Sequence, residues 1–93
     1  MSKFCCEFNE RSTQWCNSPE YNKLFIKSRI QYLKDIMKIH GVIILKEALD
    51  AFGIDISNID ISILTRYWND GDVDITYTDL GYNRYKLIFN TDN

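Results

Sequence analysis

The chain has 93 residues, 45% of them hydrophobic and 26% charged, a composition that predicts one folded domain over residues 1–93. This composition argues against a disordered chain, which would have fewer apolar and aromatic residues. The longest uninterrupted apolar run covers only residues 42–45, so no transmembrane helix is predicted. The N-terminus lacks a basic-then-apolar signal segment, and we therefore expect a cytoplasmic protein.

The net charge of −2 is divided unevenly along the chain. Residues 1–46 hold eight Lys and Arg against four Asp and Glu, which gives a charge of +4. Residues 47–93 hold three against nine, which gives −6. This asymmetry predicts a basic surface and an acidic surface, each able to steer a charged partner.

All three cysteines lie near the N-terminus, in a segment that predicts a β-hairpin over residues 3–16. The polar stretch 9–12 is typical of a turn. Pairing around this turn places Cys5 opposite Cys16. Opposed side chains on two strands have Cβ atoms about 4.5–5.5 Å apart, which would let these two thiols share one metal ion.

A long amphipathic helix is predicted over residues 18–40. Ser18 is a suitable N-cap, Pro19 suits the first helical position, and Gly41 suits the C-terminal cap. Apolar residues recur at helical spacing along it. Four lysines follow the helix beside the apolar residues: Lys23, Lys27, Lys34 and Lys38. This stripe favours a solvated face, with nucleic-acid contact as the alternative.

Shorter elements are predicted after this helix. They are a strand at 42–44, a helix at 45–52, a third helix over 57–67, and a hairpin of strands 73–79 and 84–90. The order of long helix, short strand, helix, third helix and β-hairpin is that of a winged helix-turn-helix domain. The sequence therefore predicts an α+β fold with winged-helix-like order and an N-terminal cysteine-bearing hairpin over residues 1–17, followed by a core over 18–90.

Direct nucleic-acid binding is not expected, although the predicted topology invites it. The third helix would present Arg66 as its basic group beside the acidic Asp60. The hairpin would add aspartates where a wing approaches the phosphate backbone. Phosphate contacts need several lysines or arginines, so duplex DNA would be repelled.

The hairpin region concentrates aspartates in the stretch DGDVD, which has the spacing of a calcium-binding loop. An EF-hand requires a bidentate glutamate at its twelfth position, where this chain has Gly81. The calcium loop is therefore excluded. Two interpretations remain open: solvated turn aspartates, or a surface complementary to a basic protein channel.

Catalysis has little support in the sequence, and we do not expect an enzyme. The single histidine, His40, stands at the end of the predicted long helix. No glycine-rich phosphate loop is present, and no local signature pairs His40 with a cysteine nucleophile.

Zinc binding is a more specific hypothesis, because three cysteines and one histidine would supply four ligands: Cys5, Cys6, Cys16 and His40. A straight helix of some twenty residues, however, separates its two ends by about 30 Å. Cys16 and His40 could then not share one ion. A structural zinc would need a carboxylate or a thiol from another copy. Packed free thiols and a Cys5–Cys16 disulfide are the alternatives.

The stretches HGVIIL and DAFGI resemble a segment of small proteins of tailed bacteriophages. In those proteins a long helix ending in RG or HG leads into a short apolar run and a second helix. The resemblance covers about residues 21–90 and leaves out the cysteine-bearing tail. It implies a phage protein, and small acidic phage proteins of this size are often inhibitors of bacterial defence, including anti-CRISPR proteins.

Taken with the acidic hairpin, the resemblance implies a stoichiometric inhibitor that occupies a nucleic-acid-binding surface of a host Cas nuclease. Aspartates would steer the contact and exposed aromatics would anchor it. The expected contact residues are Asp70, Asp72, Asp74, Asp79, Trp68 and Tyr82, with a place in the core as the alternative for Trp68. Two alternatives stay open, a small winged-helix DNA-binding transcription regulator and a virion or assembly component.

Overall fold

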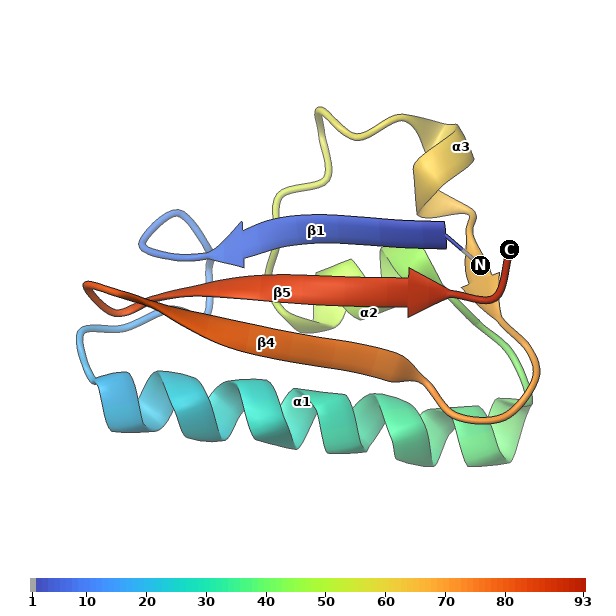
Figure 1. The fold of residues 1–93 in the computed structure, drawn as a ribbon, viewed down its shortest axis with the longest axis horizontal. Helices are drawn as coiled ribbons and strands as arrows, with labels where there is room; N and C mark the ends of the chain where they lie inside the picture. The colour runs from blue at the N-terminus through green and yellow to red at the C-terminus, as the bar shows by residue number, and fades with distance from the viewer. Residues whose placement is uncertain (1) are drawn as a thin grey trace.

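A three-stranded antiparallel sheet with helices packed against one of its faces forms the protein (Figure 1), as seen in a computed structural model that describes residues 2–93. The elements are β1 (Ser2–Phe8), α1 (Pro19–His40), β2 (Ile43–Ile44), α2 (Leu45–Ala51), α3 (Ile61–Leu64), β3 (Tyr67–Trp68), β4 (Asp74–Gly81) and β5 (Arg84–Thr91). The predicted α+β fold is confirmed. None of the helices in residues 2–93 combines the length and the apolar character that a membrane span requires.

The three-stranded sheet has the order β1-β5-β4, so the first strand of the chain pairs with the last. Cys5 lies opposite Ile88, and the predicted hairpin over residues 3–16 is therefore wrong. The physical reason is the length of the available partner strand. β5 offers a ladder that pairs every residue of β1, with buried Leu87 and Phe89 on the same face as the inward residues of β1.

The long helix α1 begins and ends where the sequence predicts. The Ser18 hydroxyl accepts a hydrogen bond from the Tyr21 N–H at 3.2 Å, and Pro19 occupies the first turn. Gly41 adopts a left-handed conformation with φ of 78°, and its N–H donates to the Met37 carbonyl at 2.8 Å. The helix buries Phe25, Ile26, Leu33 and Met37 against the sheet and α2.

The third helix is shorter than the predicted span of 57–67. α3 covers four residues from its cap at Asp60, whose carboxylate accepts from the Ser62 N–H at 3.0 Å. Residues before it form a turn in which Asp55 accepts from the Ser57 N–H. Residues after it form β3, where Trp68 pairs with Ile43 of β2. The predicted third helix is thus reduced to a single turn, and the α+β class is confirmed without the winged-helix arrangement.

One hydrophobic core lies between the sheet and the helices. Phe52 meets Phe89 edge-on at 5.9 Å between ring centroids, and Phe8 stacks on Phe25 at 5.5 Å. Strand, helix and loop residues from both halves of the chain contribute to it. The opposite face of the sheet, formed by the alternate residues of β1, β5 and β4, has no helix over it (Figure 1).

Candidate protein-binding surfaces

The tip of the β4–β5 hairpin is a two-residue turn formed by Tyr82 and Asn83. Gly81 pairs with Arg84 across it, and both turn residues have positive φ, 54° and 58°. This is the geometry of a type I′ turn, whose twist matches that of the flanking strands. Tyr82 is 94% exposed, so the turn presents an aromatic ring to solvent.

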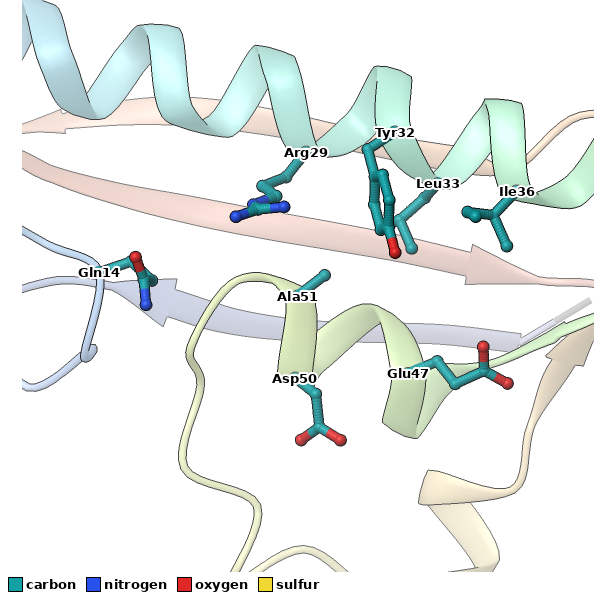
Figure 2. Close-up of a pocket in the computed structure, with 8 residues that line it drawn as sticks. All are labelled: Gln14, Arg29, Tyr32, Leu33, Ile36, Glu47, Asp50 and Ala51. Atoms are coloured by element: carbon teal, nitrogen blue, oxygen red, sulfur yellow. The ribbon is translucent and has the colours of Figure 1, made fainter.

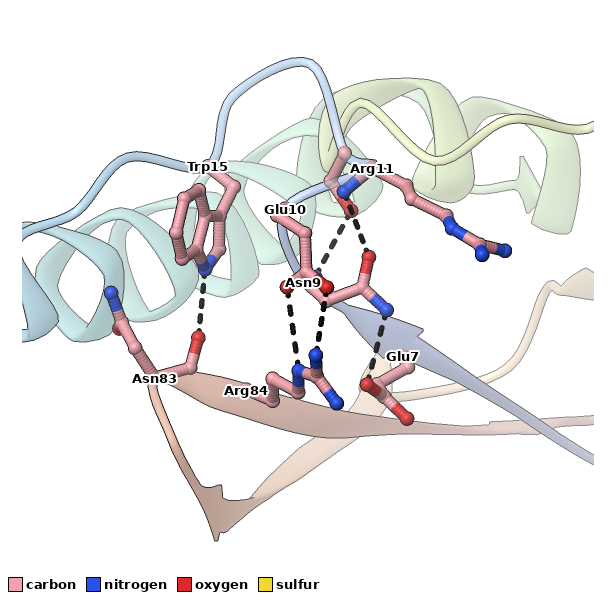
Figure 3. Close-up of polar contacts among 8 residues, drawn as sticks. Glu7, Asn9, Glu10, Arg11, Trp15, Asn83 and Arg84 are labelled. Carbon is pink, nitrogen blue, oxygen red and sulfur yellow. Dashed lines mark hydrogen bonds and ion pairs between the residues drawn. The ribbon is translucent and has the colours of Figure 1, made fainter.

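Hydrogen bonds of Asn83 connect this tip to the segment before α1 and to the first turn of α1. Its backbone carbonyl accepts from the Trp15 indole N–H at 2.7 Å, a contact drawn in Figure 3. Its side-chain oxygen accepts from Asn22 Nδ2 at 2.9 Å and from the Tyr85 hydroxyl at 3.0 Å. Its side-chain nitrogen donates to the Cys16 carbonyl at 3.1 Å. The exposed Tyr82 ring therefore stands on a rigid support.

Two ion pairs flank the tip. Arg84 contacts Glu10 at 2.8 Å (Figure 3), and Lys23 contacts Asp79 at 3.4 Å. The Gly81 N–H, which donates to Asp79, lowers the pKa of that carboxyl below its usual value, and Lys23 adds to the shift. The Asp79 carboxylate is therefore engaged by the Gly81 N–H and by Lys23, and it is not an unpaired acidic group.

A cluster of carboxylates, which we call the acidic end, lies at the opposite end of β4. It consists of Asp70, Asp72, Asp74 and Asp92, all of them exposed. Asp92 joins the group because its carboxylate accepts from the N–H groups of Asn69 and Asp70, at 2.7 and 3.1 Å. Within residues 2–93, none of the four carboxylates lies in a salt bridge.

Lysines of α1 border the acidic end without pairing with it. A hollow of about 180 Å³ is lined by Lys34, Lys38 and Asp72 among others. A second hollow, of about 430 Å³, runs along β4 between Lys34 and Asp74. The negative charge is therefore concentrated on the loop before β4 and on the C-terminal residues, with a basic border on one side.

Five of the six predicted contact residues are exposed and lie in two separate groups, and the sixth is buried. Trp68 is fully buried and donates its indole N–H to the Asn90 carbonyl at 2.7 Å, so its prediction as an exposed anchor is wrong. Asp74 and Asp79 are five residues apart on one strand, a separation of about 17 Å. The acidic end and the Tyr82 tip are consequently distinct surfaces.

Asp92 was missed by the sequence reasoning, although a signal for it existed. Counting outward from the turn at 80–83 places Asp92 opposite the aspartates that precede β4. Asn22 and Asn83 were also missed. Their roles depend on contacts 61 residues apart in the chain, and no local pattern indicates such a pairing.

The predicted zinc ligands are not brought together within one chain. Cys5 is exposed on the open sheet face, whereas Cys6 points to the core side, where burial raises the pKa of its thiol to about 12 and Cys5 adds to the shift. Cys16 precedes α1 and His40 ends it, and the 22 residues of α1 span about 33 Å. Within the described residues 2–93, no three His, Cys, Asp or Glu side chains are grouped for a metal ion.

A groove of about 430 Å³ separates α1 from α2 (Figure 2). Its lining mixes apolar and polar side chains. Arg29 reaches into it from α1, with the guanidinium 5.1 Å from the Phe25 ring and 5.6 Å from the Tyr32 ring. The Nε of Arg29 is buried without a hydrogen-bond partner in the described chain. Asp50 points away from Arg29 and pairs with Lys46 at 3.0 Å. Within the described residues, the Arg29 guanidinium in this groove lies in no salt bridge.

Comparisons of the chain with protein-family models, with curated proteins and with solved structures each found no match. The surfaces described above are therefore the basis for any statement about function.

Proposed function

We propose that this protein is a phage-encoded stoichiometric inhibitor of the anti-CRISPR kind, which binds a host Cas nuclease through its acidic end. The observation that carries the proposal is the group of four exposed carboxylates without salt bridges in residues 2–93, held on a loop and a chain end that are hydrogen-bonded to each other. Such a group is complementary to the basic channel that holds guide or target nucleic acid.

The hairpin tip supports the same proposal as a second contact. Tyr82 combines high exposure with a rigid turn, and tyrosine is among the residues that most often dominate binding energy at interfaces. Because the tip and the acidic end lie at opposite ends of β4, one partner would have to contact both along the length of the strand.

The DNA-binding alternative has less support. A recognition helix must reach along the major groove, whereas α3 spans four residues, about 6 Å. The hairpin that would serve as the wing is paired with β1 along β5 and carries the acidic end. Both features argue against phosphate contacts, which need several lysines or arginines on the binding surface.

The test is binding to a panel of purified, guide-loaded Cas nucleases, measured by biolayer interferometry together with inhibition of DNA cleavage. The triple variant Asp70→Asn/Asp72→Asn/Asp74→Asn should bind the target at least tenfold more weakly, chiefly through a slower association rate at low salt. The matched control neutralises three exposed acids elsewhere: Glu20→Gln, Asp35→Asn and Glu47→Gln. Equal loss of binding in both triples, or no binding to any nuclease, would refute the proposal.

A further inference from the structure

The strand β1 forms one edge of the three-stranded sheet and is hydrogen-bonded to β5 on one side only (Figure 1). An edge strand presents a row of backbone N–H and C=O groups that can pair with another strand. β1 has seven residues and contains neither proline nor glycine, so each of its residues has a backbone N–H that can pair. Within residues 2–93, no strand occupies its outer side.

We propose that β1 pairs antiparallel with β1 of a second copy, so that two sheets join into one of six strands about a twofold axis at Cys5. In an antiparallel pair, directly opposite residues lie on the same face of the sheet. A twofold axis therefore allows only registers in which the numbers of opposite residues add to an even sum. The sum of 10 is the register that pairs all seven residues, Ser2 to Phe8.

Charge complementarity favours this register. Lys3 and Glu7 are both exposed on the open face of the sheet, and the register places Lys3 opposite the partner's Glu7, twice by symmetry. In the neighbouring registers, with sums of 8 and 12, neither Lys3 nor Glu7 faces an opposite charge. The full-length register is thus also the one with two attractive pairs.

The same register covers apolar side chains that the single chain leaves partly exposed. On the core side of β1, Phe4 and Cys6 are half-buried and contact the edge of the core. Each would face the other across the new strand pair. The pairing would add about six to eight backbone hydrogen bonds, depending on which residues of β1 point outward.

A second copy fits this edge better than an unrelated extended segment, because an antiparallel copy of β1 brings Lys3 of each strand opposite Glu7 of the other. The inference uses β1 and the open sheet face, and the proposed function uses the acidic end. Either can fail while the other stands, since binding to a nuclease and self-association are measured separately.

Sedimentation equilibrium of the full chain over a concentration series at low salt tests the proposal. The wild type should sediment as a monomer–dimer equilibrium. Lys3→Glu alone and Glu7→Lys alone should each weaken the dimer by about tenfold, because each replaces two attractive pairs by two repulsive ones. The double variant Lys3→Glu/Glu7→Lys should restore the dimer, and so should mixing the two single variants. Lys27→Glu, an exposed site on α1, is the control that should change nothing.

Cys5 provides a second, independent readout of the register. A variant with Cys6→Ser and Cys16→Ser keeps Cys5 as its single thiol. Oxidised glutathione should link two copies through Cys5, with two molecules of reduced glutathione released for each disulfide formed. A chain that stays monomeric up to about 1 mM would overturn the proposal. A dimer that is indifferent to the charge variants, or one that forms no Cys5 link, would also overturn it.

Discussion

Asn22 is a fully buried polar residue whose amide joins three segments of the chain. Its nitrogen donates to the Cys16 carbonyl at 2.7 Å and to Asn83, and its oxygen accepts from the Cys16 N–H at 3.1 Å. Asn22→Ala should lower the free energy of unfolding by about 3 kcal/mol, because it leaves buried backbone groups unpaired and creates a cavity. Urea denaturation would measure this. Asn17→Ala, at an exposed neighbour, is the control and should change stability by less than about 0.5 kcal/mol.

Tyr82 combines a strained backbone with a side chain that contributes little to the fold. A φ of 54° is unfavourable for tyrosine, and asparagine adopts this region more readily. Tyr82→Asn should therefore raise the free energy of unfolding by about 0.5–1 kcal/mol. If the ring is a binding anchor, the same variant should bind its target more weakly. A variant that is less stable than the wild type in thermal denaturation would show that the ring supports the fold instead.

The Cys6 thiol makes stability depend on pH in the alkaline range. Burial, with Cys5 adding to it, raises the pKa of Cys6 to about 12 from an ordinary value of 9.0. The unfolded chain therefore releases this proton at lower pH than the folded chain does. The stabilising contribution is complete below pH 9.0 and is lost as the pH rises toward 12. Denaturation midpoints between pH 8 and 10.5 should fall less in Cys6→Ala than in the wild type, and an equal fall would contradict this.

At the level of the elements, β1 is an integral strand rather than a tail. Phe8 is fully buried and stacks on Phe25, whereas Cys5 on the same strand faces solvent. Phe8→Ala should lower the free energy of unfolding by about 3–5 kcal/mol because it removes a ring from the core. Cys5→Ala should be nearly neutral in the same denaturation experiment. Similar small effects from both substitutions would mean that β1 is only loosely attached.

The elements that the sequence predicts correctly are those whose signals are local. α1 carries its N-cap at Ser18 and its stop at Gly41 within the helix itself, and the turn of the last hairpin lies between two alternating strands. The pairing of β1 with β5 joins residues that are 77 to 89 positions apart, from Phe8 with Tyr85 to Ser2 with Thr91. Residues 9–12 form a turn after β1, but the chain then leads to α1 instead of a second strand. A local turn signal cannot distinguish the two outcomes.

The same difference between local signals and contacts distant in the chain applies to the candidate surfaces. The aspartates before β4 are predicted from the turn and from their spacing, and they are exposed as expected. Trp68 was misassigned because an aromatic residue in a short segment has the same sequence signature whether it faces solvent or the core. Its burial depends on the pairing of β3 with β2 and on the Asn90 carbonyl, both distant in the chain.

In the folded molecule, the basic residues 1–46 and the acidic residues 47–93 contact each other and do not form two separate regions. All three salt bridges in the described residues link the halves: Lys23 with Asp79 and Arg84 with Glu10 across the fold, and Lys46 with Asp50 within α2. The core is likewise shared between early and late residues. The acidic end holds four of the ten Asp and Glu side chains in the described residues that lie in no salt bridge, a narrower region than the charge asymmetry of the sequence predicts.

This shared core predicts that the two ends of the molecule unfold together. Trp15 reports on the hairpin tip through its bond to Asn83, and Trp68 reports on the end where β3 meets Asn90. In Trp15→Phe and Trp68→Phe, the remaining tryptophan fluorescence should have the same denaturation midpoint as the far-UV circular dichroism of that variant. A lower midpoint for Trp15 alone would mean that the tip opens before the core, and the Tyr82 turn would then lack the rigid support that its role as an anchor requires.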